Sequence, residues 1–60
     1  MNKTLYEYAK KYGLLVWTAS PDPQLHIERY RLPSSEFAVF YFSKGRLVKT
    51  QIILDNHIII

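Results

Sequence analysis

The second half of the chain alternates between apolar runs and short polar breaks in the manner of a β-hairpin. Residues 36–43 are rich in aromatic and β-branched side chains, residues 46–54 are rich in Leu, Val and Ile, and Gly45 lies between them. Aromatic and β-branched residues are enriched in strands, and glycine is enriched in the tight turns that join them. We therefore predict strands at 36–43 and 46–54 and take them as the central hairpin of a sheet.

Two registers of this hairpin are open, because a one-residue slip exchanges the two faces of a strand. A two-residue loop at Lys44-Gly45 pairs Phe42 with Leu47. It places together on one face Phe37, Val39, Tyr41, Val48, Thr50, Ile52 and Leu54. A three-residue loop with a bulge at Gly45 places on that face Ala38, Phe40, Phe42, Val48, Thr50 and Ile52 instead. Both registers leave an apolar outer face, which predicts that something covers it.

The N-terminal segment repeats apolar side chains with the period of an amphipathic helix, at Leu5, Tyr8, Ala9 and Tyr12. This predicts a helix over 4–12. Thr4 and Glu7 match the capping-box pattern at its start, and Lys10 and Lys11 complement the negative end of the helix dipole. Gly13 is expected to end the helix in the left-handed conformation.

The middle of the chain predicts two more strands. Residues 14–19 form a continuous apolar run, typical of a strand buried on both sides, with Trp17 in the core. Residues 20–23 predict a turn in which Asp22 bonds to the downstream backbone. Residues 25–31 alternate imperfectly, which predicts a strand near an edge. A helix over 36–44, capped by Ser34, is an alternative to the third strand, but the aromatic residues there favour a strand.

These elements predict an α+β fold in the order α-β-β-β-β, with one N-terminal helix packed on a four-stranded antiparallel sheet. The strands are expected near 14–19, 25–31, 36–43 and 46–54. Residues 57–60 are either a short final strand or a tail that docks on a neighbour. The expected core consists of Leu5, Tyr8, Ala9, Tyr12, Val16, Ile27, Val48, Ile52 and Leu54.

Length and composition predict a single small domain over 1–60 that needs a partner. A chain of 60 residues without cysteine has neither a large core nor disulfides to stabilise it, yet 48% of its residues are hydrophobic. We therefore expect self-association or a protein partner for the outer face. The net charge of +3 is only moderately basic. Signal-peptide and membrane-spanning patterns are missing, so a cytoplasmic location without membrane contact is expected.

Candidate catalytic and metal-binding residues are few. His26 and Glu28 lie two positions apart and would point to the same side of a strand, as a general base and its orienting carboxylate could. The sequence shows no nucleophile or phosphate-binding loop beside them. Asp55 and His57 share a strand side and could join His26 at a metal, but only if the strands are adjacent. We predict no catalytic, cofactor or metal site, and hence a protein that is not an enzyme.

The prediction for function is a small interaction protein, of a regulator or inhibitor type, that binds a protein partner. Its contact surface would be the apolar outer face and the basic hairpin turn. The residues predicted to bind the partner are Arg29, Arg31, Phe40, Phe42, Lys44, Arg46, Leu47 and Lys49. The alternative is nucleic-acid binding, because basic side chains interleaved with aromatic ones are typical of proteins that bind single strands. Lys and Arg near sheet edges would also discourage unwanted pairing whatever the function.

Thr4, Leu5, Tyr8, Ala9 and Gly13 give the predicted helix a resemblance to the first helix of small phage Cro-type repressors. The resemblance covers about a sixth of the chain. It stops before the helix-turn-helix of that family, because residues 14–19 favour a strand and Pro21 and Pro23 follow. It therefore implies no function.

Overall fold

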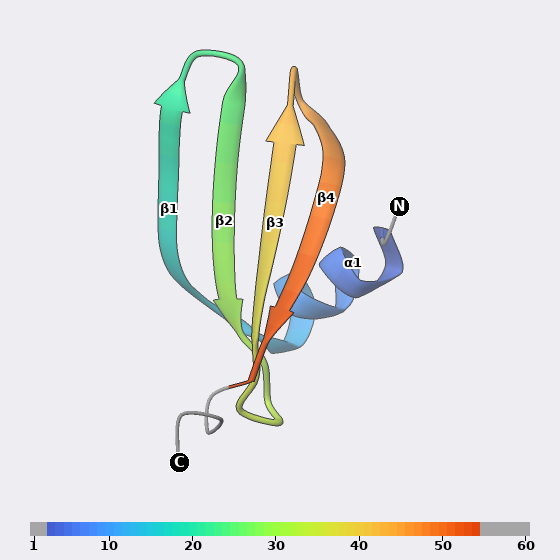
Figure 1. Ribbon diagram of the computed structural model, residues 1–60. Helices are drawn as coiled ribbons and strands as arrows, with labels where there is room; N and C mark the ends of the chain where they lie inside the picture. The colour runs from blue at the N-terminus through green and yellow to red at the C-terminus, as the bar shows by residue number, and fades with distance from the viewer. Residues whose placement is uncertain (1–2, 55–60) are drawn as a thin grey trace.

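A computed structural model describes residues 3–54 and shows the α+β arrangement predicted from the sequence. The elements are α1 (Lys3–Tyr12), β1 (Leu14–Asp22), β2 (Leu25–Arg31), β3 (Phe37–Ser43) and β4 (Arg46–Ile53). The four strands form one antiparallel sheet in the order β1-β2-β3-β4 (Figure 1). The alternative helix over 36–44 is therefore excluded. The predicted last segment at 57–60 lies outside the described residues.

The end of α1 differs from the prediction in its conformation. The Gly13 N–H donates to the Ala9 carbonyl at 2.8 Å and so closes the last helical turn. The prediction of a left-handed Gly13 is wrong, because Gly45 is the one glycine with a positive φ among the described residues. Glycine is required at 13 for another reason. A Cβ there would lie 2.7 Å from the Ala9 carbonyl oxygen and 2.9 Å from that of Arg31.

The β3–β4 hairpin combines the two predicted registers. Lys44 and Gly45 have φ values of 53° and 79°, and two positive φ values are what a two-residue type I′ loop requires. Next to the loop, Phe42 pairs with Leu47, as in the first register. A register shift between Tyr41 and Phe42 then adds one residue to β4. Beyond it the pairs are Phe40 with Thr50 and Ala38 with Ile52, as in the second register.

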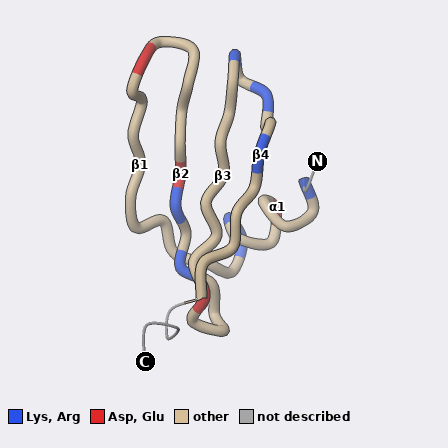
Figure 2. The backbone as a smooth tube through the Cα atoms, in the orientation of Figure 1, with Lys and Arg blue, Asp and Glu red and all other residues tan. Residues whose placement is uncertain are grey.

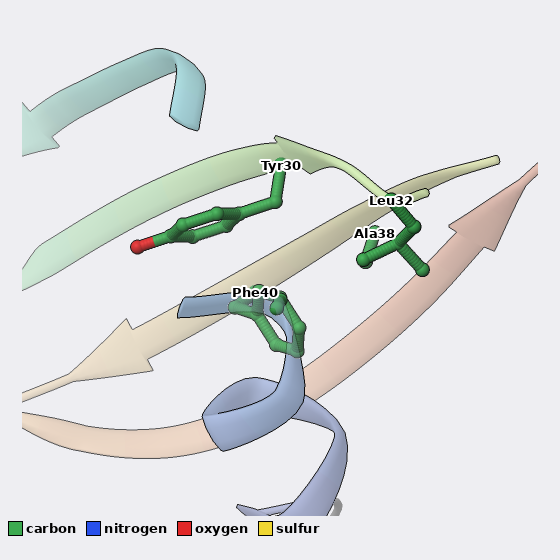
Figure 3. Packing of buried hydrophobic residues seen from close by; sticks show 5 residues of the cluster. Tyr30, Leu32, Ala38 and Phe40 are labelled. Carbon is green, nitrogen blue, oxygen red and sulfur yellow. The ribbon is translucent and has the colours of Figure 1, made fainter. Parts of the chain in front are cut away.

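The main core cluster lies between α1 and one face of the sheet, and on the opposite face Val39 is also buried, with 6% exposure. The buried residues of the main cluster are Ala9, Tyr30, Leu32, Ala38 and Phe40 (Figure 3), and the partly buried residues packed against it are Leu5, Tyr6, Phe42 and Leu47. The Tyr6 ring meets the Phe40 and Phe42 rings edge to face, with centroids 4.9 Å and 5.1 Å apart. Aromatic pairs favour such tilted geometries. Tyr6 therefore attaches the helix to the centre of the sheet.

The predicted core was largely wrong. Six of its members have exposed fractions between 41% and 58%, namely Tyr8, Tyr12, Val16, Val48, Ile52 and Leu54. Ile27 is half-buried and lies on the face away from the helix, whereas Leu5 and Ala9 do join the core. The helix is rotated relative to the prediction because Tyr6 faces the sheet. Tyr8 and Tyr12 contact each other outside it, with ring centroids 5.2 Å apart.

The positions of the strands in the sheet also differ from the prediction. β2 was expected near an edge and is internal, so the central pair is β2–β3 and β4 is an edge. β1 was expected to be buried on both sides, but it forms the other edge, and Trp17 is 49% exposed. A continuous apolar run is compatible with a buried strand or with an uncovered edge, and pattern alone does not separate the two. The predicted bond of Asp22 is confirmed, since its carboxylate accepts from the Gln24 N–H at 2.8 Å.

Candidate functional site

No element within residues 3–54 covers the sheet face opposite α1, and the pairing register defines which residues this face carries. Because cross-strand partners share a face and successive residues alternate, His26, Glu28 and Tyr30 point toward the helix and their neighbours point away. We call the uncovered side the open face. The register places on it Leu14, Trp17, Ala19, Asp22, Leu25, Ile27, Arg29, Arg31, Phe37, Val39, Tyr41, Ser43, Arg46, Lys49, Gln51 and Ile53. α1 is the one helix of the described chain, and it lies on the other side of the sheet (Figure 1).

Cations on the open face lie over its aromatic rings. The Arg29 guanidinium carbon is 4.7 Å from the centroid of the Phe37 ring, and the Arg31 guanidinium carbon is 5.7 Å from the same centroid. The Lys49 ammonium is 5.2 Å from the centroid of the Tyr41 ring. These contacts are cation–π interactions, which hold charged groups against an apolar surface.

The charge on the open face is almost entirely positive. The one carboxylate that the register places there is Asp22, at the β1–β2 turn, and it already accepts the Gln24 N–H. Figure 2 shows the other acidic positions of the sheet region on β2 and in the loop before β3. Within residues 3–54 the ion pair is His26 with Glu28 on the helix side, so Arg29, Arg31 and Lys49 have no carboxylate at salt-bridge distance. The open face therefore complements a negatively charged surface.

A polar cluster lies on the helix side and joins α1, β1 and β2. The Tyr6 and Tyr30 hydroxyls both donate to Glu28 Oε1, each at 2.9 Å, and His26 Nε2 lies 2.9 Å from Glu28 Oε2. Ser20 Oγ lies 3.1 Å from His26 Nδ1. The Glu28 side chain is 17% exposed, so its carboxylate is largely removed from water and depends on these donors.

The protonation of this cluster follows from its burial and bonds. Burial raises the pKa of Glu28, but hydrogen bonds from His26, Tyr6 and Tyr30 outweigh that effect and hold the pKa below its ordinary value. Burial, together with the adjacent Glu28 carboxylate, raises the pKa of both tyrosines. The cluster is therefore most stable with Glu28 ionised and both tyrosines neutral.

Sequence reasoning missed Ser20 as a neighbour of His26. The two come together because β1 and β2 pair with Ala19 opposite Ile27, a register that the sequence did not provide. The contacts run from the Ser20 hydroxyl to His26 and from His26 to Glu28, in the same sequence as nucleophile, base and carboxylate in an activated hydroxyl. However, the Glu28 carboxylate also binds two tyrosines, and the Tyr6 bond ties the helix to the sheet. The contacts thus serve first to hold three elements together.

The structure separates the residues predicted to bind a partner into three places. Arg29, Arg31 and Lys49 lie together on the open face, as described above. Phe40 is fully buried, and Phe42 and Leu47 pack against the core, so the prediction that these three belong to an outer surface is corrected. Both aromatic residues point toward α1 because they pair with His26 and Glu28, which lie on the helix side of β2. Lys44 and Arg46 flank Gly45 at the hairpin turn.

A pocket of about 520 Å³ opens beside this turn on the helix side. Its lining residues are Lys3, Tyr6, Phe42, Gly45, Arg46 and Leu47. Its lining combines two cations, Lys3 and Arg46, with aromatic and aliphatic side chains. The pocket is of the size typical of ligand sites, and Arg46, Phe42 and Leu47, three of the residues predicted to bind a partner, line it together.

The described residues contain no group of three or more His, Cys, Asp or Glu side chains placed to hold a metal ion. Asp55 and His57, considered above as metal ligands, lie outside the described residues. Over the same part of the chain, no helix has the length and apolar character needed to cross a bilayer. The chain matches no protein-family model, no curated protein and no solved structure.

Proposed function

We propose that this protein is a non-enzymatic binding protein that docks an acidic surface of another protein on its open face. The observation that carries the proposal is a set of cations that lie over aromatic rings and have no carboxylate of residues 3–54 at salt-bridge distance, on a face that no element of the described chain covers. The cores of protein interfaces are enriched in Tyr, Trp, Phe and Arg and depleted of Asp and Glu, and the open face has this composition.

The geometry prepares Arg29 for a carboxylate. Its Nε is buried without a hydrogen-bond partner, because the guanidinium lies against the Phe37 ring. Part of the side-chain entropy that binding would cost is therefore already lost in the free protein. A carboxylate that reaches the outer nitrogens would form charge-assisted hydrogen bonds, while Trp17 and Ile27 lose contact with water.

Two other occupants of the open face fit less well. Bases of a single-stranded nucleic acid need aromatic faces on which to stack, and here cations already lie over the Phe37 and Tyr41 rings. A second copy packed face to face would oppose Arg29, Arg31 and Lys49 to like charges of its partner, which is unfavourable. An acidic protein surface meets neither difficulty, and the basic turn at Lys44 and Arg46 extends the positive region (Figure 2).

A peptide-display selection tests the proposal. The bait is the full chain, and the probe is a library in which Asp or Glu positions are interleaved with apolar ones. The test variant is Arg29→Gln with Lys49→Gln. The control is Lys10→Gln with Lys11→Gln on α1, which removes the same charge and also removes two cation–π contacts, those with Tyr6 and Tyr12.

We expect acidic, aromatic-rich peptides to be selected and to bind the wild type and the control with similar affinity. Loss of two interface cations should weaken binding of the test variant by about tenfold or more. The proposal is abandoned if the selected peptides are not acidic, or if the two variants bind them equally. Tight binding of a thymidine oligonucleotide that declines steeply with salt, and that the test variant loses, would favour the nucleic-acid alternative.

A further inference from the structure

The two edges of the sheet differ in how they are protected. β4 carries the cations Arg46 and Lys49, and charged side chains on an edge strand discourage pairing with another strand; its single register shift does not distinguish it from β1. β1 has no charged residue before Asp22, although it also contains register shifts. Its first four residues, Leu14 to Trp17, have exposed fractions of 66%, 48%, 44% and 49%. β1 is thus an apolar edge strand, and no strand of the described chain pairs with its outer edge (Figure 1).

We infer that two copies of the chain join through β1, strand to strand and antiparallel, so that their sheets become one. An edge strand presents a row of unpaired N–H and C=O groups, and a second strand satisfies them. In a pair related by a two-fold axis each surface contacts its own equivalent, which requires a self-complementary edge.

The charges around β1 meet this requirement. The strand itself is neutral from Leu14 to Pro21, so its centre brings no like charges together. Lys10 and Lys11 precede it and Asp22 ends it. Antiparallel pairing brings the basic end of one copy toward the acidic end of the other. A parallel pair would instead align ends of the same sign.

The exposure of β1 on both faces favours a second copy over an isolated peptide strand. Leu15 lies on the helix side of the sheet and Trp17 on the open face, and both are about half exposed. A second copy brings its own Leu15 and Trp17 beside them, so apolar surface is covered on both sides of the seam. Edge pairing also keeps the open-face cations of the two copies side by side rather than opposed.

The first test is the mass of the native chain in solution, measured by light scattering or sedimentation over a dilution series. Val16→Lys places a charge on the proposed seam, and Val48→Lys is its matched control. Like Val16, Val48 lies on an edge strand at a register shift. The exposed fractions of the two side chains are similar, 44% for Val16 and 48% for Val48. We expect a dimer that dissociates on dilution. Val16→Lys should raise its dissociation constant by about tenfold or more, and Val48→Lys should leave it unchanged.

A second test does not depend on a disruptive variant. Since the sequence has no cysteine, single cysteines can be placed in turn at Leu15, Val16, Trp17 and Thr18, with Val48→Cys as control. Residues close to a two-fold axis between antiparallel strands lie close to their own copies, so at least one of the four should form a crosslinked dimer rapidly on oxidation. The inference is wrong if the native chain has the mass of one copy at every concentration. It is also wrong if Val48→Cys crosslinks as fast as the best β1 position.

Discussion

Replacing Glu28 should release the helix from the sheet. Its carboxylate receives three hydrogen bonds, each about 2.9 Å long, and one of them comes from Tyr6 on α1. Glu28→Ala leaves the Tyr6 and Tyr30 hydroxyls without this acceptor, and Tyr30 is only 6% exposed. An unsatisfied buried polar group costs about 1–3 kcal/mol, so we expect a loss of about 2–4 kcal/mol of stability. Glu28→Gln keeps an acceptor and loses the charge, which should cost about 1–2 kcal/mol.

These losses are large for a chain of this length. At about 0.05–0.15 kcal/mol per residue, the whole protein is stable by roughly 3–9 kcal/mol. Urea unfolding followed by circular dichroism measures the change, with Glu7→Gln on the exposed side of α1 as control. A difference of less than about 0.5 kcal/mol between Glu28→Ala and the wild type, or an equal effect of the control, would refute the role given to this cluster.

The same cluster predicts a pH dependence whose sign follows from the pKa shifts. The pKa of Glu28 is lowered in the folded protein, so the stability it contributes is present above its ordinary pKa and is lost as the pH falls through the folded value. The pKa values of Tyr6 and Tyr30 are raised, so their contribution is present below the ordinary tyrosine pKa and is lost at strongly alkaline pH. Glu28→Gln should reduce both dependences, which urea midpoints at a series of pH values would show.

Three further substitutions should change the midpoint of urea unfolding. Tyr6→Phe removes the hydroxyl that bonds to Glu28 and keeps the ring in the core, so we expect a loss of about 1 kcal/mol; no loss would mean that the ring alone fixes the helix. Gly13→Ala forces a Cβ to within 2.7 Å of the Ala9 carbonyl oxygen and should cost about 1–3 kcal/mol, and a neutral effect would show that the helix end moves freely. In Gly45→Ala the new Cβ would have no atom within 4 Å, but alanine would have to adopt a φ of 79°. We therefore expect a loss of about 1–2 kcal/mol of stability from backbone strain alone. A much larger loss would indicate a contact at the turn.

The strands and the helix could be predicted because their signals are local. Aromatic and β-branched runs define β3 and β4, and the three- and four-residue spacing defines α1 to within one residue. The turn at Gly45 could also be predicted, since few other residues accept its φ. The prediction for Asp22 was correct for the same reason, because its bond spans only two residues.

The faces of these elements could not be predicted, because tertiary contacts determine them. The apolar spacing of α1 favoured Tyr8 and Tyr12 as the buried tyrosines. The helix tyrosine that packs against the core is the partly buried Tyr6, whose hydroxyl reaches Glu28 and whose ring reaches Phe40. The hydrophobic pattern shows how apolar a face is. It contains no information on whether a buried tyrosine would find the hydrogen-bond partner that it needs.

The bulge in β4 had the largest effect on the predicted site. One additional residue at Val48 pairs Tyr41 with Lys49 and Phe40 with Thr50, so Phe37 and Tyr41 share the open face with Lys49, Gln51 and Ile53. The sequence was compatible with two registers, and nothing in it indicated that a bulge in β4 would combine them. Arg29 and Arg31 did not depend on this choice, because they take their face from β2.

The size of the sheet relative to the helix explains why two different surfaces remain uncovered. A helix of 10 residues is about 15 Å long, whereas four strands at about 4.8 Å spacing, each seven to nine residues long, form a sheet that is larger in both directions. The helix can cover only the middle of one face, so the opposite face and the β1 edge are left over.

These two surfaces differ in charge, since the open face carries Arg29, Arg31 and Lys49 and the first part of β1 carries no charged side chain. A partner that suits one does not suit the other, and pairing through β1 leaves both open faces on the same side of the joined sheet. Self-association and binding of an acidic partner are therefore compatible, and a dimer would offer that partner two sites.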